Sequence, residues 1–168
     1  MSKNDDRTIR FTGLKSGIYT YDIQLGDSFF KEFENEEIKG GKVNFTVKME
    51  RMERMLLFTF SFAGELTTQC DRCLGEMKVS VSGEEHLNVR FSDTEVSEDE
   101  ETAILPESAN EIDLTPWLYE YVAVRMPLQH IHSEGDCDPE VTKYIADEEQ
   151  KHGDDYTDPR WDALKELK

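Results

Sequence analysis

The sequence has few basic residues, few cysteines and no long apolar run. Its 168 residues include 19 Lys and Arg against 37 Asp and Glu, which gives a formal net charge of −18. Because nucleic acid is bound by cations that displace its counterions, a chain this acidic is repelled from it at long range, although a local basic patch could still touch it. A cationic protein is the easier partner, unless the charge serves solubility alone.

No apolar stretch is long enough to cross a membrane. A secretory signal carries an apolar run after its first residues, and no such run follows the polar segment Met1–Arg10. Three cysteines without an export signal are typical of a reducing compartment and argue against a disulfide framework. We therefore predict a cytoplasmic protein without a membrane partner.

No catalytic arrangement of residues is visible. His86 interrupts a predicted strand, and His152 lies in an acidic tail. The acidic residues cluster in polar segments, where no apolar flank would raise their pKa values. The pair Gly40–Gly41 indicates a turn and not a phosphate-binding loop. We expect no enzymatic activity, no catalytic residue and no small-molecule substrate.

Alternation of apolar and polar residues predicts an antiparallel sheet. The pattern occurs at 18–25, 43–49, 56–62 and 77–91, with connections too short for the crossovers that parallel strands need. A helix is predicted over 114–127, where Pro116 stands in the first turn and apolar residues follow at helical spacing. We expect an α+β fold with four to six strands covered by this one main helix. Two of its aromatic side chains should be buried against the sheet: Trp117 and Tyr121.

Two polar regions complete the predicted organisation. Nine acidic residues and no basic one lie between Ser92 and Asp113, which predicts a long acidic loop. After Gln129 the chain is expected to be polar and irregular as far as Asp158, which can cap a short amphipathic segment with Trp161, Leu164 and Leu167 on one face. We predict a β-rich domain over 1–130 and a C-terminal extension over 131–168.

Cys70 and Cys73 form a Cys-x-x-Cys turn between two predicted strands. This spacing points both sulfurs the same way, as half of a tetrahedral zinc site requires. His132 and Cys137 would complete a Cys3His set, and His130 is an alternative nitrogen ligand. Two other interpretations remain: a redox dithiol, and reduced thiols that hold no metal.

Basic residues gather around the turn that follows the strand 43–49. Lys48, Arg51 and Arg54 lie on this predicted hairpin, and Arg72 lies within the cysteine turn. These four residues are candidates for RNA binding. Solvated hairpin charges without a ligand are the alternative.

Taken together, these motifs resemble the YceD family. The resemblance runs from about Tyr19 to the end of the chain, and its most specific parts are the turn Cys70-Asp71-Arg72-Cys73-Leu74 and the terminal Asp158-Pro159 with Leu164–Lys168. The helix start Ile112-Asp113-Leu114, followed by His132 and Cys137, adds to it. Many members carry a second cysteine-rich cluster where this chain has His130, His132 and Cys137.

Members of that family are described as large ribosomal RNA subunit accumulation proteins, bacterial with plastid relatives. The resemblance implies a non-catalytic factor that supports accumulation or maturation of large-subunit (23S) rRNA. The net charge of −18 suits this role if the protein holds a basic ribosomal or assembly protein and affects rRNA through it. The alternatives are a zinc- or thiol-dependent RNA-processing enzyme and a direct RNA-binding module that uses Lys48, Arg51 and Arg54.

Overall fold

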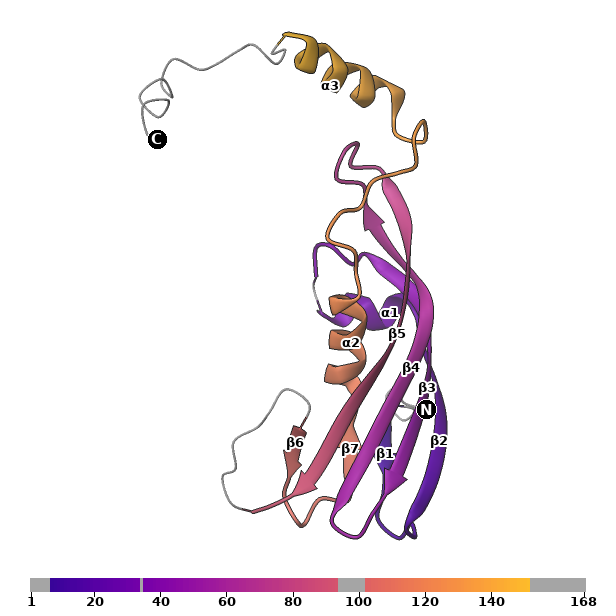
Figure 1. Cartoon of the computed structure of the whole chain (residues 1–168), viewed down its shortest axis with the longest axis vertical. Helices are drawn as coiled ribbons and strands as arrows, with labels where there is room; N and C mark the ends of the chain where they lie inside the picture. The colour runs from indigo at the N-terminus through magenta and orange to yellow at the C-terminus, as the bar shows by residue number, and fades with distance from the viewer. Residues whose placement is uncertain (1–6, 34, 94–101, 152–168) are drawn as a thin grey trace, which may run out of the picture. The chain divides into compact units, whose positions relative to one another are not determined.

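The computed structural model describes residues 7–33, 35–93 and 102–151 (Figure 1). None of the helices in these ranges is long and apolar enough to cross a membrane. In chain order the elements are β1 (Thr8–Arg10), β2 (Gly17–Leu25), α1 (Asp27–Phe30), the 3-10 turn η1 (Lys31–Phe33), β3 (Gly40–Arg51), β4 (Met55–Gln69), β5 (Glu76–Phe91), β6 (Thr102–Leu105), β7 (Glu111–Asp113), α2 (Thr115–Val124) and α3 (Pro139–Lys151).

The described residues form two compact units. The first, which we call the sheet unit, combines residues 7–68 with 77–128. The second, which we call the Cys/His unit, combines 69–76 with 129–151, so the cysteine turn is grouped with the C-terminal part of the chain. The domain boundary at residue 130 that we inferred from the sequence stays a prediction.

The sheet of the first unit has five strands in the order β2-β3-β4-β5-β6. β2 and β3 pair antiparallel without a break from Gly17↔Arg51 to Leu25↔Val43, and β3 and β4 pair antiparallel from Gly40↔Thr67 to Arg51↔Leu56. β6 joins β5 in parallel, and β1 pairs with β7 in a separate two-stranded sheet. The α+β class with a mostly antiparallel sheet is therefore confirmed.

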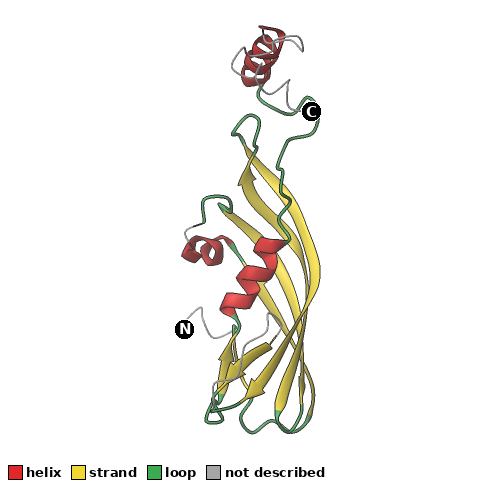
Figure 2. Cartoon of the chain, turned by 60° about the vertical axis from the view of Figure 1, so that its left-hand side comes forward, coloured by secondary structure: helices red, strands yellow, loops and turns green. Residues whose placement is uncertain are grey.

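The core lies on one face of this sheet. On β3 the side chains of Val43, Phe45, Val47 and Met49 are buried, and the residues between them face solvent. This is the period-2 pattern from which the strand was predicted. α2 lies across the buried face (Figure 2) and contributes Leu118 and Val122 to the core.

The two aromatic residues predicted to be buried on this helix, Trp117 and Tyr121, are only half-buried. The Tyr121 ring packs edge-on against Phe60 at 5.1 Å, and its hydroxyl donates to the backbone carbonyl of His86 at 3.3 Å. A tyrosine ring packs on the core while its hydroxyl keeps a polar partner, which places the residue at the rim. The smaller Leu118 and Val122 fill the centre.

Within the predicted acidic loop, residues 102–105 and 111–113 form β6 and β7, so the loop prediction is wrong at these two places. Both strands carry apolar residues that the surrounding acidic residues masked: β6 is Thr-Ala-Ile-Leu, and Ile112 of β7 is buried. The predicted acidic segment 94–101 lies outside the described residues.

The chain after Gln129 was expected to be irregular, but residues 139–151 form α3. The helix begins after Asp138, whose side-chain carboxylate accepts the backbone N–H of Glu140 at 2.9 Å, and Pro139 is its first residue. An acidic cap followed by proline is a helix-start signal, and the expectation overlooked it here. His152 and the predicted amphipathic segment from Asp158 onward lie outside the described residues.

Candidate metal centre

The Cys70–Gly75 turn connects β4 to β5 and is closed by backbone hydrogen bonds. The N–H of Cys70 donates to the carbonyl of Gly75 at 2.8 Å, and the N–H of Leu74 donates back to the carbonyl of Cys70 at 2.8 Å. Leu74 has a φ of 58°, a left-handed conformation that L-residues other than glycine rarely adopt. A Cβ on Gly75 would lie 3.3 Å from the Cys73 sulfur and 3.6 Å from Cε1 of His132, so glycine leaves room for both groups.

The second ligand-bearing segment is held against this turn by a reciprocal pair of hydrogen bonds. Asp71 donates its N–H to the carbonyl of His130 at 2.7 Å, and its carboxylate accepts the N–H of His130 at 2.7 Å. The same carboxylate lies 3.6 Å from Nδ1 of the buried His130 ring. His130, which we had considered as an alternative metal ligand, therefore positions the turn and is not part of the ligand cluster.

A tight turn then brings His132 and Cys137 to the same place. The N–H of Asp136 donates to the carbonyl of Ser133 at 3.0 Å, and Gly135 adopts a φ of 91°. Glycine takes this conformation without a steric penalty. The five-residue spacing between His132 and Cys137 thus lets both side chains face the cysteine turn.

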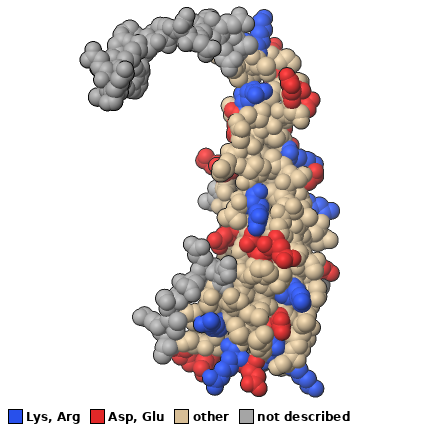
Figure 3. Space-filling model, viewed as in Figure 1, with Lys and Arg blue, Asp and Glu red and all other residues tan. Residues whose placement is uncertain are grey.

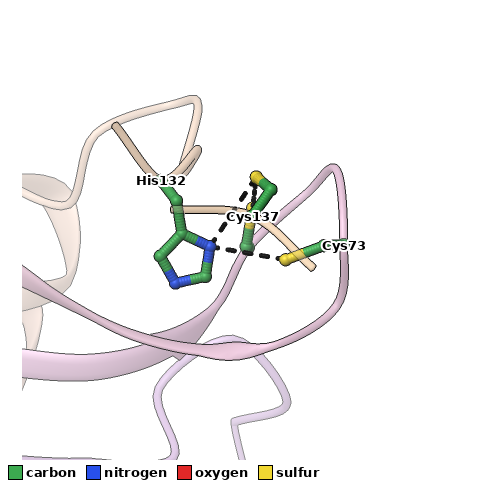
Figure 4. Close-up of side chains that lie close together, drawn as sticks. Cys73, His132 and Cys137 are labelled. Atoms are coloured by element: carbon green, nitrogen blue, oxygen red, sulfur yellow. Dashed lines mark hydrogen bonds between the residues drawn. The ribbon is translucent and has the colours of Figure 1, made fainter. Parts of the chain in front are cut away.

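Four potential ligand atoms meet here, from Cys70, Cys73, His132 and Cys137, and all lie within 4.8 Å of one another. The sulfurs of Cys70 and Cys137 are 3.8 Å apart, and Nδ1 of His132 is 3.3 Å from the Cys73 sulfur and 3.9 Å from the Cys137 sulfur. Figure 4 shows this nitrogen turned towards both sulfurs. The structure therefore brings together the four residues that the sequence nominated.

These distances fit a tetrahedral zinc ion. Zn–S bonds of about 2.3 Å and a Zn–N bond of about 2.0 Å would place two sulfurs about 3.8 Å apart and the nitrogen about 3.5 Å from each sulfur. The remaining ring nitrogen of His132, Nε2, lies 3.2 Å from the carbonyl of Glu76. A hydrogen bond from this nitrogen would fix the tautomer in which Nδ1 is free to coordinate a metal.

The thiol pKa values differ strongly within the cluster. Burial raises the pKa of Cys70, but backbone N–H groups of His132, Cys73 and Arg72 donate to its sulfur and bring the pKa down to about 6. Backbone N–H groups of Asp138 and Gly75 lower the pKa of Cys73. Burial raises the pKa of Cys137. Backbone donors aimed at sulfur favour the thiolate form, which is the form that binds a metal.

The His132 ring responds to the same neighbours. Its hydrogen bond to Cys73 raises the pKa of the imidazole, while burial acts in the opposite direction. A neighbouring thiolate thus favours the protonated form of the ring, and a divalent cation bound by the cluster would displace that proton.

A family model described as "Large ribosomal RNA subunit accumulation protein YceD" matches residues 58–168, well over half of the chain. The chain belongs to the YceD family. No curated protein and no solved structure gives a significant match. The resemblance inferred from the cysteine turn and the terminal motif is confirmed by this match.

The YceD match begins inside β4 and includes both segments of the candidate metal centre as well as α2. The strands β1, β2 and β3 precede it. The matched region thus contains every residue of the ligand cluster.

Three of the four residues nominated for RNA binding lie in the sheet unit of this YceD protein, at different positions of the β3–β4 hairpin, and RNA binding by any of the four stays a prediction. Lys48 projects from the solvent face of β3, whereas Arg51 continues the opposite, buried row of Val47 and Met49. Arg54 lies in the turn that follows, and Arg72 belongs to the Cys/His unit. On the face shown in Figure 3, basic and acidic side chains are interspersed over the sheet.

Two structural features were not predicted from the sequence. One is the clamp between Asp71 and His130, for which an acidic residue inside the cysteine turn was the available signal. The other is the turn Phe11–Gly13, which lies beside Arg51 and Arg54 in the wall of one cavity. Nothing in the alternation pattern could have revealed this second neighbourhood, because its parts lie far apart in the chain.

Proposed function

We propose that this protein acts in the cytoplasm as a non-catalytic factor that supports accumulation of large-subunit rRNA by holding a cationic ribosomal or assembly protein. The family description supplies the link to large-subunit rRNA. The observation that carries the choice of partner is the charge around the metal centre. The Cys/His unit exposes six carboxylates against two cations among residues with described side chains: Asp71, Glu76, Glu134, Asp136, Asp138 and Glu140 against Arg72 and Lys143.

Zinc in the Cys3His cluster would serve structure in this proposal. With Cys70, Cys73, His132 and Cys137 all bound, the ion would have four protein ligands and no open position for water or substrate. Catalytic zinc sites keep such a position open, so the geometry favours a structural site over a zinc-dependent RNA-processing enzyme. The ion would fix the loop that carries Glu134 and Asp136.

An acidic surface of this kind favours a basic protein by steering and complementarity. Such attraction acts over about 8 Å at 0.15 M ionic strength, so the rate of association should fall as salt rises. Contact with rRNA would then be made by the partner, which resolves the conflict between a net charge of −18 and an rRNA-related role.

The test uses the full-length chain as bait in cell extract, with and without RNase. The variant Glu134→Gln, Asp136→Asn, Glu140→Gln removes three charges near the metal centre. Its matched control removes three exposed charges of the sheet unit, Glu36→Gln, Glu37→Gln, Glu120→Gln. We expect RNase-resistant capture of basic large-subunit or assembly proteins, abolished by the first variant and kept with the control.

A second variant set addresses the acidic segment that lies outside the described residues, by neutralising Glu98 to Glu101. If capture depends on that segment and not on Glu134, Asp136 and Glu140, the binding surface lies elsewhere on the chain. In cells, loss of the gene should lower mature large-subunit rRNA relative to small-subunit rRNA. An unchanged ratio and an unchanged subunit profile, under normal and cold growth, would contradict the role itself.

A further inference from the structure

A cavity of about 450 Å³ lies where β3 turns into β4. Four parts of the sheet unit form its wall: the β3–β4 turn, the turn that follows β1, the end of β5, and the segment 107–109 between β6 and β7. Arg51, Arg54, Phe11 and Phe91 line it together with two acidic residues, Glu53 and Glu107. The size is in the range of small-molecule sites.

Arg51 and Arg54 are the cations of this cavity, and within the described part of the chain neither forms an ion pair. The Nη1 atom of Arg51 is shielded from water and lacks an acceptor among the described residues. This is unexpected in a chain with 37 acidic residues, two of which, Glu53 and Glu107, line the same cavity. The remaining N–H groups of Arg51 and those of Arg54, which no acidic neighbour engages in an ion pair, are available to an incoming anion.

The direction of each side chain on β3 decides which basic residues can bind an anion in this cavity. Arg51 follows Val47 and Met49 on the buried face and so points into the cavity side of the sheet unit. Lys48 points to the opposite face and lines a separate hollow with His86. The anion-binding pair is therefore Arg51 with Arg54, without Lys48.

The cavity also has an aromatic wall. The rings of Phe11 and Phe91 pack with centroids 5.4 Å apart, and Phe91 is the more exposed of the two. An inorganic anion alone would leave this wall uncovered. A ligand that carries both a phosphate and a flat ring would use the arginines and Phe91 together, because bases stack on aromatic side chains.

We propose that this cavity binds one nucleotide unit of single-stranded RNA, with the phosphate between Arg51 and Arg54 and the base against Phe91. This goes beyond the proposed function, because it gives the chain a direct contact with RNA in addition to any protein partner. The contact is local, since the charge of −18 prevents attraction at long range. Arginine suits the task because its planar fork binds phosphate through two hydrogen bonds.

The experiment measures the affinity of the full-length protein for a short fluorescent single-stranded RNA by anisotropy at several salt concentrations. Arg51→Gln with Arg54→Gln is compared with Lys42→Gln plus Lys78→Gln, which removes the same charge from another cavity of the sheet unit. We expect the arginine pair to weaken binding at least tenfold and the lysine pair to change it less than twofold. The slope of log affinity against log salt should become shallower by about 0.7 for each phosphate that the variant no longer neutralises.

Two further variants separate phosphate from base. Phe91→Leu keeps an apolar side chain but removes the ring, so it should weaken the binding of RNA and of a mononucleotide. Inorganic phosphate, which would contact only the arginines, should compete with the bound RNA as well as it does in the wild-type protein. Arg51→Lys with Arg54→Lys keeps the charge and should give an intermediate loss of affinity, which provides a readout if the glutamine variants fold poorly. Equal effects of the arginine and lysine pairs would overturn the proposal. So would competition by a polyglutamate peptide as strong as that by RNA, which would make the ligand a carboxylate.

Discussion

The sulfur atoms of Cys70 and Cys137 lie 3.8 Å apart, although 67 positions separate the two residues in the chain. The distance is much longer than the bond of about 2.05 Å in a disulfide, and it equals the spacing of about 3.8 Å expected for two sulfurs on one tetrahedral zinc ion. Both residues are buried. Together with Cys73 and His132 beside them, two reduced thiols at this distance could hold a metal ion.

Removal of the imidazole should abolish stable zinc binding. Protein purified without chelator is expected to contain about one equivalent of zinc, and His132→Ala should contain far less because a structural site needs all four ligands. His86→Ala is the matched control, since His86 lies on the outer face of the sheet unit. Elemental analysis provides the measurement. Zinc-free wild-type protein, prepared fresh and reduced, would favour the interpretation as metal-free thiols.

Because Leu74 adopts a left-handed backbone conformation, we expect glycine at this position to favour the turn that holds the zinc ligands. Its side chain is 70% exposed, so its removal costs little packing, whereas its φ of 58° costs about 1–2 kcal/mol for a residue with a Cβ. Leu74→Gly should therefore hold zinc more tightly against a competing chelator than Leu74→Ala, which deletes almost the same side chain but keeps the strained Cβ. Equal retention by the two variants would mean that the turn relaxes when zinc binds.

Much of the fold could be predicted because its sheet has one buried face. Alternation along 43–49 gives the inner and outer rows of β3 directly, and the pairing with β4 follows from the short turn between them. β6 and β7 could not be found in this way, since strands of four and three residues are too short to show a period. The partial exposure of Trp117 was not predicted either, because helical spacing shows which residues lie on the apolar face but not which of them lie at the centre of that face.

The sequence predicted which residues form the ligand set, but it could not show how the fold brings them together. Cysteine spacing nominated Cys70 and Cys73, yet the choice between His130 and His132 depends on which one the Asp71 clamp occupies. The sequence could not show that Arg51 lines one cavity with Phe11 and Phe91, because this depends on how segments that are distant in the chain pack around that cavity.

Because α2 packs on the sheet with one face, substitution of two of its apolar residues by alanine should affect the free energy of unfolding very differently. Leu118 is fully buried, and Leu118→Ala should lower the free energy of unfolding by about 2–5 kcal/mol through reduced packing and the cavity that remains. Val124 is 66% exposed, and Val124→Ala should change it by less than about 0.5 kcal/mol. Urea denaturation followed by tryptophan fluorescence would compare them. Similar losses of stability would show that α2 does not pack as described.

Gly64 offers the strictest test of the strand register. It stands opposite Val43 in the β3–β4 pair, and a Cβ added there would lie 2.2 Å from the carbonyl oxygen of Lys42 and 2.6 Å from Cα of Val43. Both are backbone atoms, which cannot move aside without disturbing the ladder, so Gly64→Ala should cost at least about 1–3 kcal/mol of unfolding free energy.

Gly26 is the matched control for that substitution. An added Cβ at Gly26 meets nothing within 4 Å, and its φ of −123° suits any residue, so Gly26→Ala should shift the unfolding free energy by less than about 0.5 kcal/mol. The two variants make the same chemical change, and only the proximity of β3 distinguishes them. If both leave stability unchanged, β4 does not pair with β3 in this register, and the row that points Arg51 towards its cavity would have to be assigned again.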